Sequence, residues 1–217
     1  MTYTDWPIFD LRLRCRDVQL RPVREADLPE LAALEPEDYE MDPRLEMLPG
    51  LTDRQNRQRL FHQTYWKAMG TWSPSSWALH MAVRHEDRLV GVQTVEGENF
   101  PVLRTVDTAS WLVPEVRGRG IGVAMRIAVL GLAFDHLGAV AAVTSAREDN
   151  HASLGVSRRV GYRDNGVSFV AERSGRVLLQ HLRLTAAEWT HGAEVEVLDL
   201  EPCGPWFGVD QGTSISS

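Results

Sequence analysis

A glycine-rich turn, Arg117-Gly-Arg-Gly-Ile-Gly122, constrains the fold of this chain more than any other stretch of its sequence. The turn follows a run with strand periodicity, Thr105 to Val113, which Pro114 ends because proline has no amide hydrogen for a sheet. After the turn, apolar residues recur at helical spacing from Gly122 to Leu137, and Ala139 to Val143 reads as a short buried strand. The sequence therefore predicts a strand–helix–strand unit with the glycine-rich turn at the start of the helix.

The glycines and arginines of this turn have the composition of an anion-binding site. Gly118, Gly120 and Gly122 have no Cβ to keep an anion from the backbone amides, and the following helix adds the positive end of its dipole. Arg117 and Arg119 add positive charge. The turn therefore predicts a pyrophosphate-binding cradle, with an ordinary tight turn as the alternative. The G-x-G-x-G spacing does not fit a dinucleotide fingerprint, and the G-K-[ST] of a P-loop is missing.

The rest of the chain alternates between strand and helix periods. Thr52-Asp-Arg-Gln55 is a capping box that opens an amphipathic helix, and Trp77 to Val95 reads as a hairpin. Asn150 or Ser153 starts a further helix that ends at Gly161. Other expected elements are a strand at Val18 to Pro22, a helix at Asp27 to Leu34 capped by Asp27, a hairpin of Val167 to Ala171 with Val177 to Leu184 around Ser174-Gly175, and a short helix opened by the capping box Thr185 to Glu188.

These elements predict the fold class α+β, with a mixed, mainly antiparallel sheet flanked by helices. No repeat, low-complexity tract or Gly/Ser linker marks a second domain. We expect one domain over residues 1–217, with a core of about residues 15–189 and a C-terminal extension of residues 190–217.

Charge and cysteine content exclude several classes of function. The chain has 23 basic and 30 acidic residues and a net charge of −7, which disfavours a general nucleic-acid binder. Cys15 and Cys203 are isolated, and the seven histidines show no metal-ligand spacing, so we expect neither a disulfide framework nor a metal site. No apolar run approaches the roughly 18 residues of a membrane span. We therefore expect a cytoplasmic protein without a membrane or nucleic-acid partner.

Several segments of the chain resemble a known family. Arg117 to Gly122 is similar to the R/Q-x-x-G-x-G/A signature of the GCN5-related N-acetyltransferase (GNAT) family. Trp111-Leu-Val-Pro114 resembles the strand end before that signature, and Asn150-His-Ala-Ser153 followed by Gly161-Tyr162 resembles the later N-x-x-S…G-F/Y segment. Trp6-Pro-Ile-Phe and the Leu11-Arg-Leu-Arg stretch look like the opening of bacterial RimJ/RimL-like members. The resemblance covers much of the chain.

This resemblance implies a splayed sheet that binds acetyl-CoA as a co-substrate. The backbones of Leu112 and Val113 would pair with the pantetheine arm, and Asn150, assisted by Ser153, would hydrogen-bond its amides. A plain helix cap is the alternative role for Asn150. The pyrophosphate would lie on the cradle formed by Arg117, Gly118, Arg119, Gly120, Ile121 and Gly122.

The resemblance also implies direct transfer of an acetyl group to a primary amine. That reaction needs a neutral amine, a polarised carbonyl and a protonated leaving thiolate. Asp107 and Glu96 are the candidate carboxylate bases, and solvated strand residues are their alternative reading. Many family members carry a tyrosine acid seven residues after the asparagine, but Ser157 stands there in this chain. Ser157 is therefore the candidate acid, with water as the alternative donor.

The acceptor and the assembly stay open at this point. A small-molecule amine or a protein N-terminus fits the resemblance, and so does a homodimer. His80 is either a base or a structural strand residue, and the cluster Trp66, Trp72 and Trp77 either lines an acceptor pocket or packs in the core. The rival function is a non-catalytic acyl-CoA-binding sensor or partner-binding module on the same fold.

Overall fold

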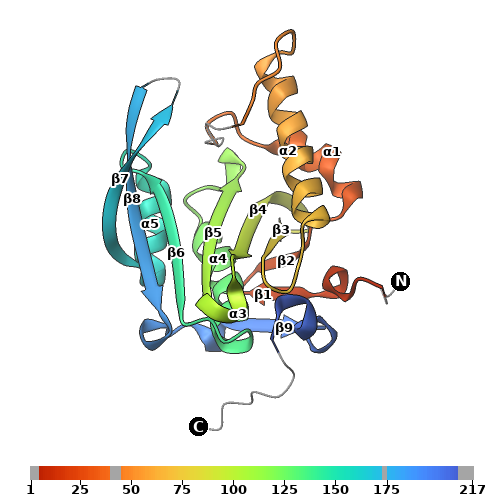
Figure 1. Cartoon of the computed structure of the whole chain (residues 1–217), viewed down its shortest axis with the longest axis vertical. Coiled ribbons are helices and arrows are strands. Elements are labelled where there is room, and N and C mark those ends of the chain that lie inside the picture. The colour runs from red at the N-terminus through yellow and green to blue at the C-terminus, as the bar shows by residue number, and fades with distance from the viewer. Residues whose placement is uncertain (1–4, 40–44, 173–174, 210–217) are drawn as a thin grey trace.

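A computed structural model describes residues 5–39, 45–172 and 175–209 of the chain (Figure 1). The helices are α1 (Leu28–Leu34), α2 (Asp53–Gly70), α3 (Phe100–Leu103), α4 (Ile121–Gly131) and α5 (His151–Val160), with a π-helical turn at Leu132–His136. The strands are β1 (Arg12–Cys15), β2 (Val18–Pro22), β3 (Trp77–His85), β4 (Arg88–Gly97), β5 (Thr105–Leu112), β6 (Ala141–Arg147), β7 (Arg163–Glu172), β8 (Gly175–Thr185) and β9 (Val195–Leu198). Short 3-10 turns lie at Pro7–Asp10, Glu25–Asp27, Pro114–Val116, Ala186–Glu188, Gly192–Glu194 and Glu201–Phe207.

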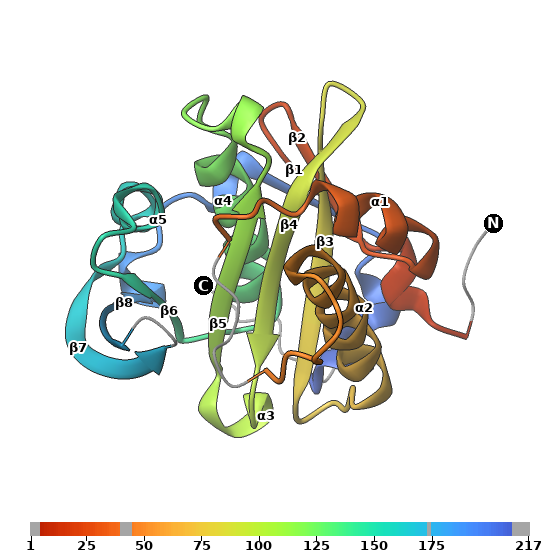
Figure 2. The same ribbon diagram turned by 90° about the horizontal axis from the view of Figure 1, so that it is seen from above.

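The described strands form one nine-stranded sheet in the order β7-β8-β6-β5-β4-β3-β2-β1-β9. The β5–β6 pair is parallel, and every other pair of described strands is antiparallel. Helices α1 and α2 cover one face of the central strands, α4 covers the other, and α5 packs beside α4 and β6 (Figure 2). The predicted fold class, a mixed and mainly antiparallel sheet flanked by helices, is confirmed.

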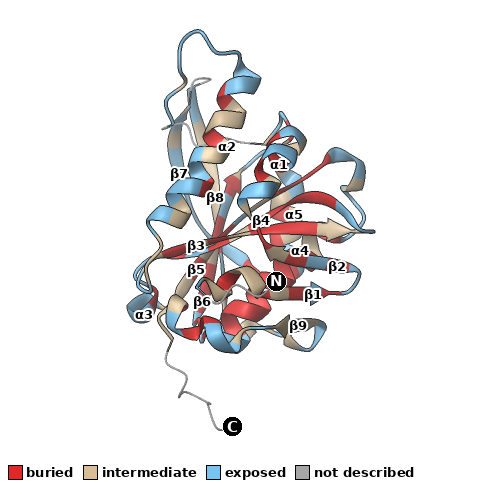
Figure 3. Cartoon of the chain, turned by 90° about the vertical axis from the view of Figure 1, so that its right-hand side faces the viewer, coloured by how far each residue is buried: buried red, intermediate tan, exposed pale blue. Residues whose placement is uncertain are grey.

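The core lies between the central strands and α4. Every residue of α4 from Ala124 to Gly131 is buried, and so are Leu79, Met81 and Val83 on β3. Figure 3 shows buried residues running through the central strands and α4, while the outer faces of α1 and α2 are exposed. This packing fixes α4, and with it the glycine-rich turn at its N-terminus, against the end of β5.

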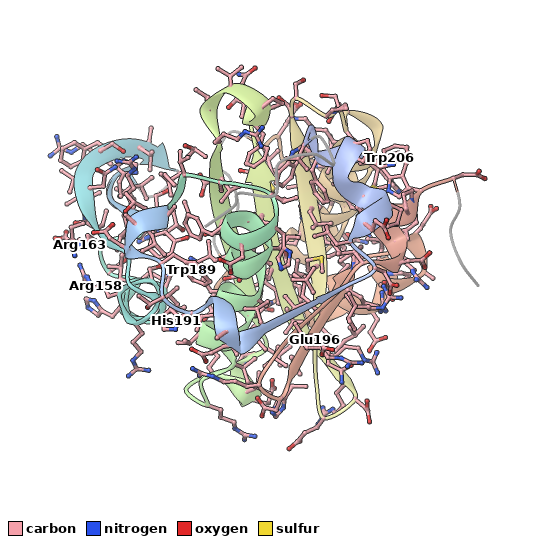
Figure 4. All side chains as sticks on the ribbon, turned by 90° about the horizontal axis from the view of Figure 1, so that it is seen from below. Arg158, Arg163, Trp189, His191, Glu196 and Trp206 are labelled. Atoms are coloured by element: carbon pink, nitrogen blue, oxygen red, sulfur yellow. The ribbon has the colours of Figure 1, made fainter. Side chains whose placement is uncertain are left out.

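The C-terminal segment crosses the underside of the molecule and completes the sheet. Figure 4 shows Trp189 and His191 on the side of α5 and Trp206 on the opposite side, with Glu196 between them. Strand β9 pairs antiparallel with β1. A Cβ at Gly131 would lie 2.7 Å from the Val195 side chain, so glycine is required where α4 meets this segment. Residues 195–198 of the expected extension thus form the edge strand of the sheet.

Local sequence signals account for most helix ends. Thr52 and Gln55 form the predicted capping box, and Asn150 caps α5, which ends at Gly161 with a φ of 107°. Asp27 does not cap α1, because its carboxylate instead accepts hydrogen bonds from Arg21 and from the Arg24 amide.

Two further expectations concern the capping box at Thr185 and the hairpin turn at Ser174. The Thr185 to Glu188 capping box is present and opens a single 3-10 turn, while Ser174 lies outside the described residues. Among the helices of the described chain, none is long and apolar enough to cross a membrane.

Candidate active site

Strands β5 and β6 pair over a short distance and then separate. Their register runs from Thr105 opposite Ala141 to Asp107 opposite Val143, and ends there. Beyond this point β5 continues to Leu112 beside β4, whereas β6 continues beside β8. The Thr144 hydroxyl donates to the Thr108 carbonyl at 2.8 Å across the point of separation. The predicted splay therefore opens beyond Thr108, along an edge of β5 that pairs with no described strand.

The register of β5 decides which of its backbone groups face this opening. In an antiparallel pair, alternate residues direct both N–H and C=O to the partner strand. The Val113 amide donates to the Val90 carbonyl of β4 at 2.9 Å, so Val113, Trp111 and Ala109 face β4. Ser110 and Leu112 consequently direct their backbone groups into the splay. Of the two expected pantetheine partners, Leu112 has its N–H on the open side, whereas the Val113 amide is already bonded to β4.

The glycine-rich turn has the geometry of an anion cradle. Gly118 and Gly120 have φ values of 77° and 87°, and a Cβ at either would meet nothing within 4 Å. Within the described chain, no amide from Gly118 to Gly122 donates to a backbone carbonyl. A Cβ at Gly122 would lie 3.2 Å from Val156, so this glycine allows α4 and α5 to pack closely. Five amides without backbone partners at a helix N-terminus fit a pyrophosphate group, with Ile121 contributing the first amide of α4.

The two arginines of the turn differ in their surroundings. Arg117 makes a bidentate ion pair with Asp38 at 2.6 and 2.9 Å, and its Nε donates to the Leu112 carbonyl at 3.0 Å. These hydrogen bonds hold the pKa of Asp38 below its usual range. Arg119 is exposed and contacts no acceptor among the described residues. Arg119 is therefore the cation available to an anion, whereas Arg117 ties the cradle to the connection between α1 and α2.

The start of α5 lies beside the cradle. Asn150 Oδ1 accepts the Ser153 amide at 3.1 Å, which is the helix-cap role weighed in the sequence. Ser157 is buried, and its hydroxyl donates to the Ser153 carbonyl at 3.1 Å. The proton of Ser157 therefore points to the carbonyl of its own helix, as serine commonly does within helices.

A buried arginine that the sequence reading missed lies beneath the splay. Arg126 of α4 is 2% exposed and donates to Ser110 Oγ at 3.2 Å and Ser157 Oγ at 3.5 Å. Its Nε is buried without a hydrogen-bond partner, and no described carboxylate lies within ion-pair distance. A buried cation without a contacting anion favours negative charge that develops nearby, on the open side of β5.

Two carboxylates face each other on the α2 side of the sheet. Asp107 lies directly opposite Glu96 in the β4–β5 register, and both line a cavity of about 520 Å³. Burial raises the pKa of Asp107, while the Thr108 amide, which donates to it at 2.6 Å, and Arg126 partly offset this. Burial and then the charge of Asp107 raise the pKa of Glu96. A carboxylate with a raised pKa is a better proton acceptor near neutral pH.

The described residues contain no group of three or more His, Cys, Asp or Glu side chains arranged to hold a metal ion.

A family model described as an acetyltransferase (GNAT) domain matches residues 17–163. Mycobacterium smegmatis RimJ, solved in complex with CoA-disulfide, is 20% identical, with a TM-score of 0.65 over 92% of this chain and 97% of that one. RimL, a ribosomal L7/L12 α-N-protein acetyltransferase solved in complex with coenzyme A, is 18% identical, with a TM-score of 0.61 over 78% and 94% of the two chains. A GNAT-family acetyltransferase from Bacillus anthracis is 13% identical, with a TM-score of 0.62 over 82% and 99%.

Proposed function

The chain belongs to the GNAT acetyltransferase family, and from this premise we propose that it transfers an acetyl group from acetyl-CoA to a primary amine by direct attack. The observation that carries the proposal is the splay between β5 and β6, which leads from free strand amides to the cradle at the start of α4. Acetyl-CoA supplies the acetyl group as a thioester that a neutral amine can attack. The remaining roles belong to residues of the chain.

The cradle and the splay would hold the co-substrate. The amides from Gly118 to Gly122, with Arg119 beside them, would bind the pyrophosphate, and Arg117 would add charge once it leaves Asp38. Ser110 and Leu112 would pair with the pantetheine arm as an added strand does. Asn150 and Ser153 would border the arm from the start of α5.

Two groups of the chain would serve the reaction itself. Asp107 would accept the proton of the amine, directly or through water, because burial raises its pKa and makes it a stronger base than an exposed aspartate. The N–H of Ser110 or Leu112 would donate to the oxygen that becomes negative as the amine attacks. The Ser157 hydroxyl donates to the Ser153 carbonyl of its own helix, so water would protonate the leaving thiolate, as the alternative to Ser157.

We also propose the broader assignments that the sequence suggested. Residues 1–217 form a single acetyltransferase domain, whose acceptor is an amine on a small molecule or a protein N-terminus. Cys15 and Cys203 are free and buried, which fits a cytoplasmic location.

Calorimetric binding of acetyl-CoA and thiol release with a panel of amines test this function. The proposal predicts saturable acetyl-CoA binding and thiol release that requires an amine, with a mass gain of one acetyl group on that amine. Asp107→Asn should lower kcat/KM most above the pKa of Asp107, where the wild-type carboxylate is ionised and can accept the proton, and should remove the fall of wild-type kcat/KM toward low pH. Glu96→Gln, at the opposite strand position, is the matched control. Binding without thiol release for any amine would instead support the non-catalytic sensor, and absence of binding would refute both functions.

A further inference from the structure

A second cavity lies on the same face of the sheet as Asp107, beneath α1 and α2. It has a volume of about 180 Å³ and lies apart from the cavity of the two carboxylates. Its walls are mostly aliphatic and aromatic, with Leu28 and Leu60 from the helices and Val92 and Trp111 from the sheet. Engineered apolar cavities of about 150 Å³ bind benzene, so this volume suits a group of that size.

The polar groups that line this cavity carry no net charge. The His80 Nδ1 lies 2.8 Å from Thr94 Oγ1, and burial lowers the pKa of His80 to about 4, which keeps its ring neutral. The Nε2 of the same ring is buried without a partner among the described residues. Glu35 and Arg57 pair with each other at 3.5 Å. A cationic group in this cavity would therefore lose its hydration without gaining a counter-ion.

The cavity is close enough to Asp107 for one small molecule to reach both. Thr94 lies opposite Ala109 in the β4–β5 register, and Asp107 is one two-residue step further along the same face of β5. Such a step spans roughly 7 Å. A ring in the cavity and an amine at the carboxylate can thus be joined by a linker of two or three atoms.

We propose that this cavity selects the acceptor: it binds a compact, neutral, apolar group of about the size of a phenyl ring that is joined to the primary amine. The inference rests on the proposed acetyl transfer and names its acceptor class. A linear aliphatic diamine, whose second charge would enter the cavity, is a poor acceptor. The apolar group can come from a free arylalkylamine or from the first side chain of a peptide.

Calorimetric titration of the protein saturated with CoA, which has no acetyl group to transfer, tests this inference. The probes are 2-phenylethylamine, phenylalanine amide and 1,4-diaminobutane. Thr64→Trp fills the cavity from the exposed surface of α2, and Gln63→Trp places the same side chain at an exposed neighbour that does not line it. We expect at least one aromatic probe to bind about tenfold tighter than the diamine, with that binding weakened at least about tenfold by Thr64→Trp and unchanged by Gln63→Trp.

The outcomes distinguish a peptide N-terminus from a free amine as the acceptor, and failure of the cavity inference from failure of the proposed acetyl transfer. Tighter binding of phenylalanine amide than of 2-phenylethylamine assigns the cavity to a peptide N-terminus, and the reverse order assigns it to a free amine. Equal or tighter binding of the diamine, equal binding by Thr64→Trp and Gln63→Trp, or binding of no aromatic probe overturns the inference. Acetyl-CoA affinity and thiol release, measured on the same preparations, show whether the proposed function survives. Circular dichroism confirms that both variants are folded.

Discussion

Gly120→Asp is the substitution that most clearly separates the cradle from an ordinary turn. Gly120 precedes α4 with φ 87° and ψ −9°, and a Cβ there would meet no atom within 4 Å. The aspartate side chain therefore fits sterically, and its two effects are backbone strain and a negative charge among the free amides. Gly166→Asp is the matched control, because Gly166 has φ 95° and equally open surroundings in β7, away from the cradle.

The two effects differ in size and in what they change. A non-glycine residue in the left-handed region costs about 1 kcal/mol of unfolding free energy, and this applies to both variants. Two like unit charges about 4 Å apart repel by roughly 1 kcal/mol in bulk water and about 4 kcal/mol near a protein surface. A pyrophosphate on the cradle would therefore bind between about fivefold and about 1000-fold more weakly to Gly120→Asp.

The assay is isothermal titration with acetyl-CoA, combined with denaturant unfolding of both variants. The account predicts similar losses of stability and a loss of acetyl-CoA affinity in Gly120→Asp alone. Equal acetyl-CoA affinity of the two folded variants would refute the assignment of the turn as a pyrophosphate site.

Three further substitutions test single contacts. Asn150→Ala should lower the unfolding free energy by about 1 kcal/mol, because the cap of α5 is lost, and urea unfolding measures this effect. The same substitution should weaken acetyl-CoA binding in calorimetry if Asn150 borders the pantetheine arm. Ser157→Ala should leave the pH profile of kcat unchanged, because the wild-type Ser157 hydroxyl donates its proton to the Ser153 carbonyl. A fall of kcat without a change of KM in steady-state kinetics would instead identify Ser157 as the acid. Burial lowers the pKa of His80 to about 4, below its ordinary value of 6.5, so between these pH values the unfolded chain binds a proton that the folded protein does not. The unfolding free energy should therefore fall by up to about 3 kcal/mol as the pH drops from 6.5 to 4. His80→Phe should flatten this part of the curve of unfolding free energy against pH, and an unchanged slope would contradict the burial of His80 as its cause.

The sequence predicts those parts of the fold that local signals determine. Proline and glycine mark both ends of the turn before α4, and hydroxyl and amide side chains mark the starts of α2 and α5. The pairing of β9 with β1 could not be predicted, because four weakly alternating residues near the C-terminus carry no information about a partner almost two hundred residues away.

The same limit applies to the site. The cradle is contiguous in sequence and could be predicted, whereas the register between β4 and β5 decides that the amides of Ser110 and Leu112, and not that of Val113, face the splay. Arg126 interrupts an apolar stripe by a single position, and its burial follows from neighbours on β5 and α5. The bond from Arg117 to Asp38 joins positions 79 residues apart. Such contacts leave no periodic pattern in the sequence.

Amide hydrogen exchange with and without acetyl-CoA measures whether the splay and the cradle bind the co-substrate. The account predicts that the free amides of Ser110, Leu112 and Gly118 to Gly122 become protected when acetyl-CoA is added, because the splay and the cradle hold it together. The Val113 amide, already bonded to the Val90 carbonyl, should exchange at an unchanged rate. Unchanged exchange at the amides of the splay and the cradle, in a sample that calorimetry shows to be saturated, would contradict the account.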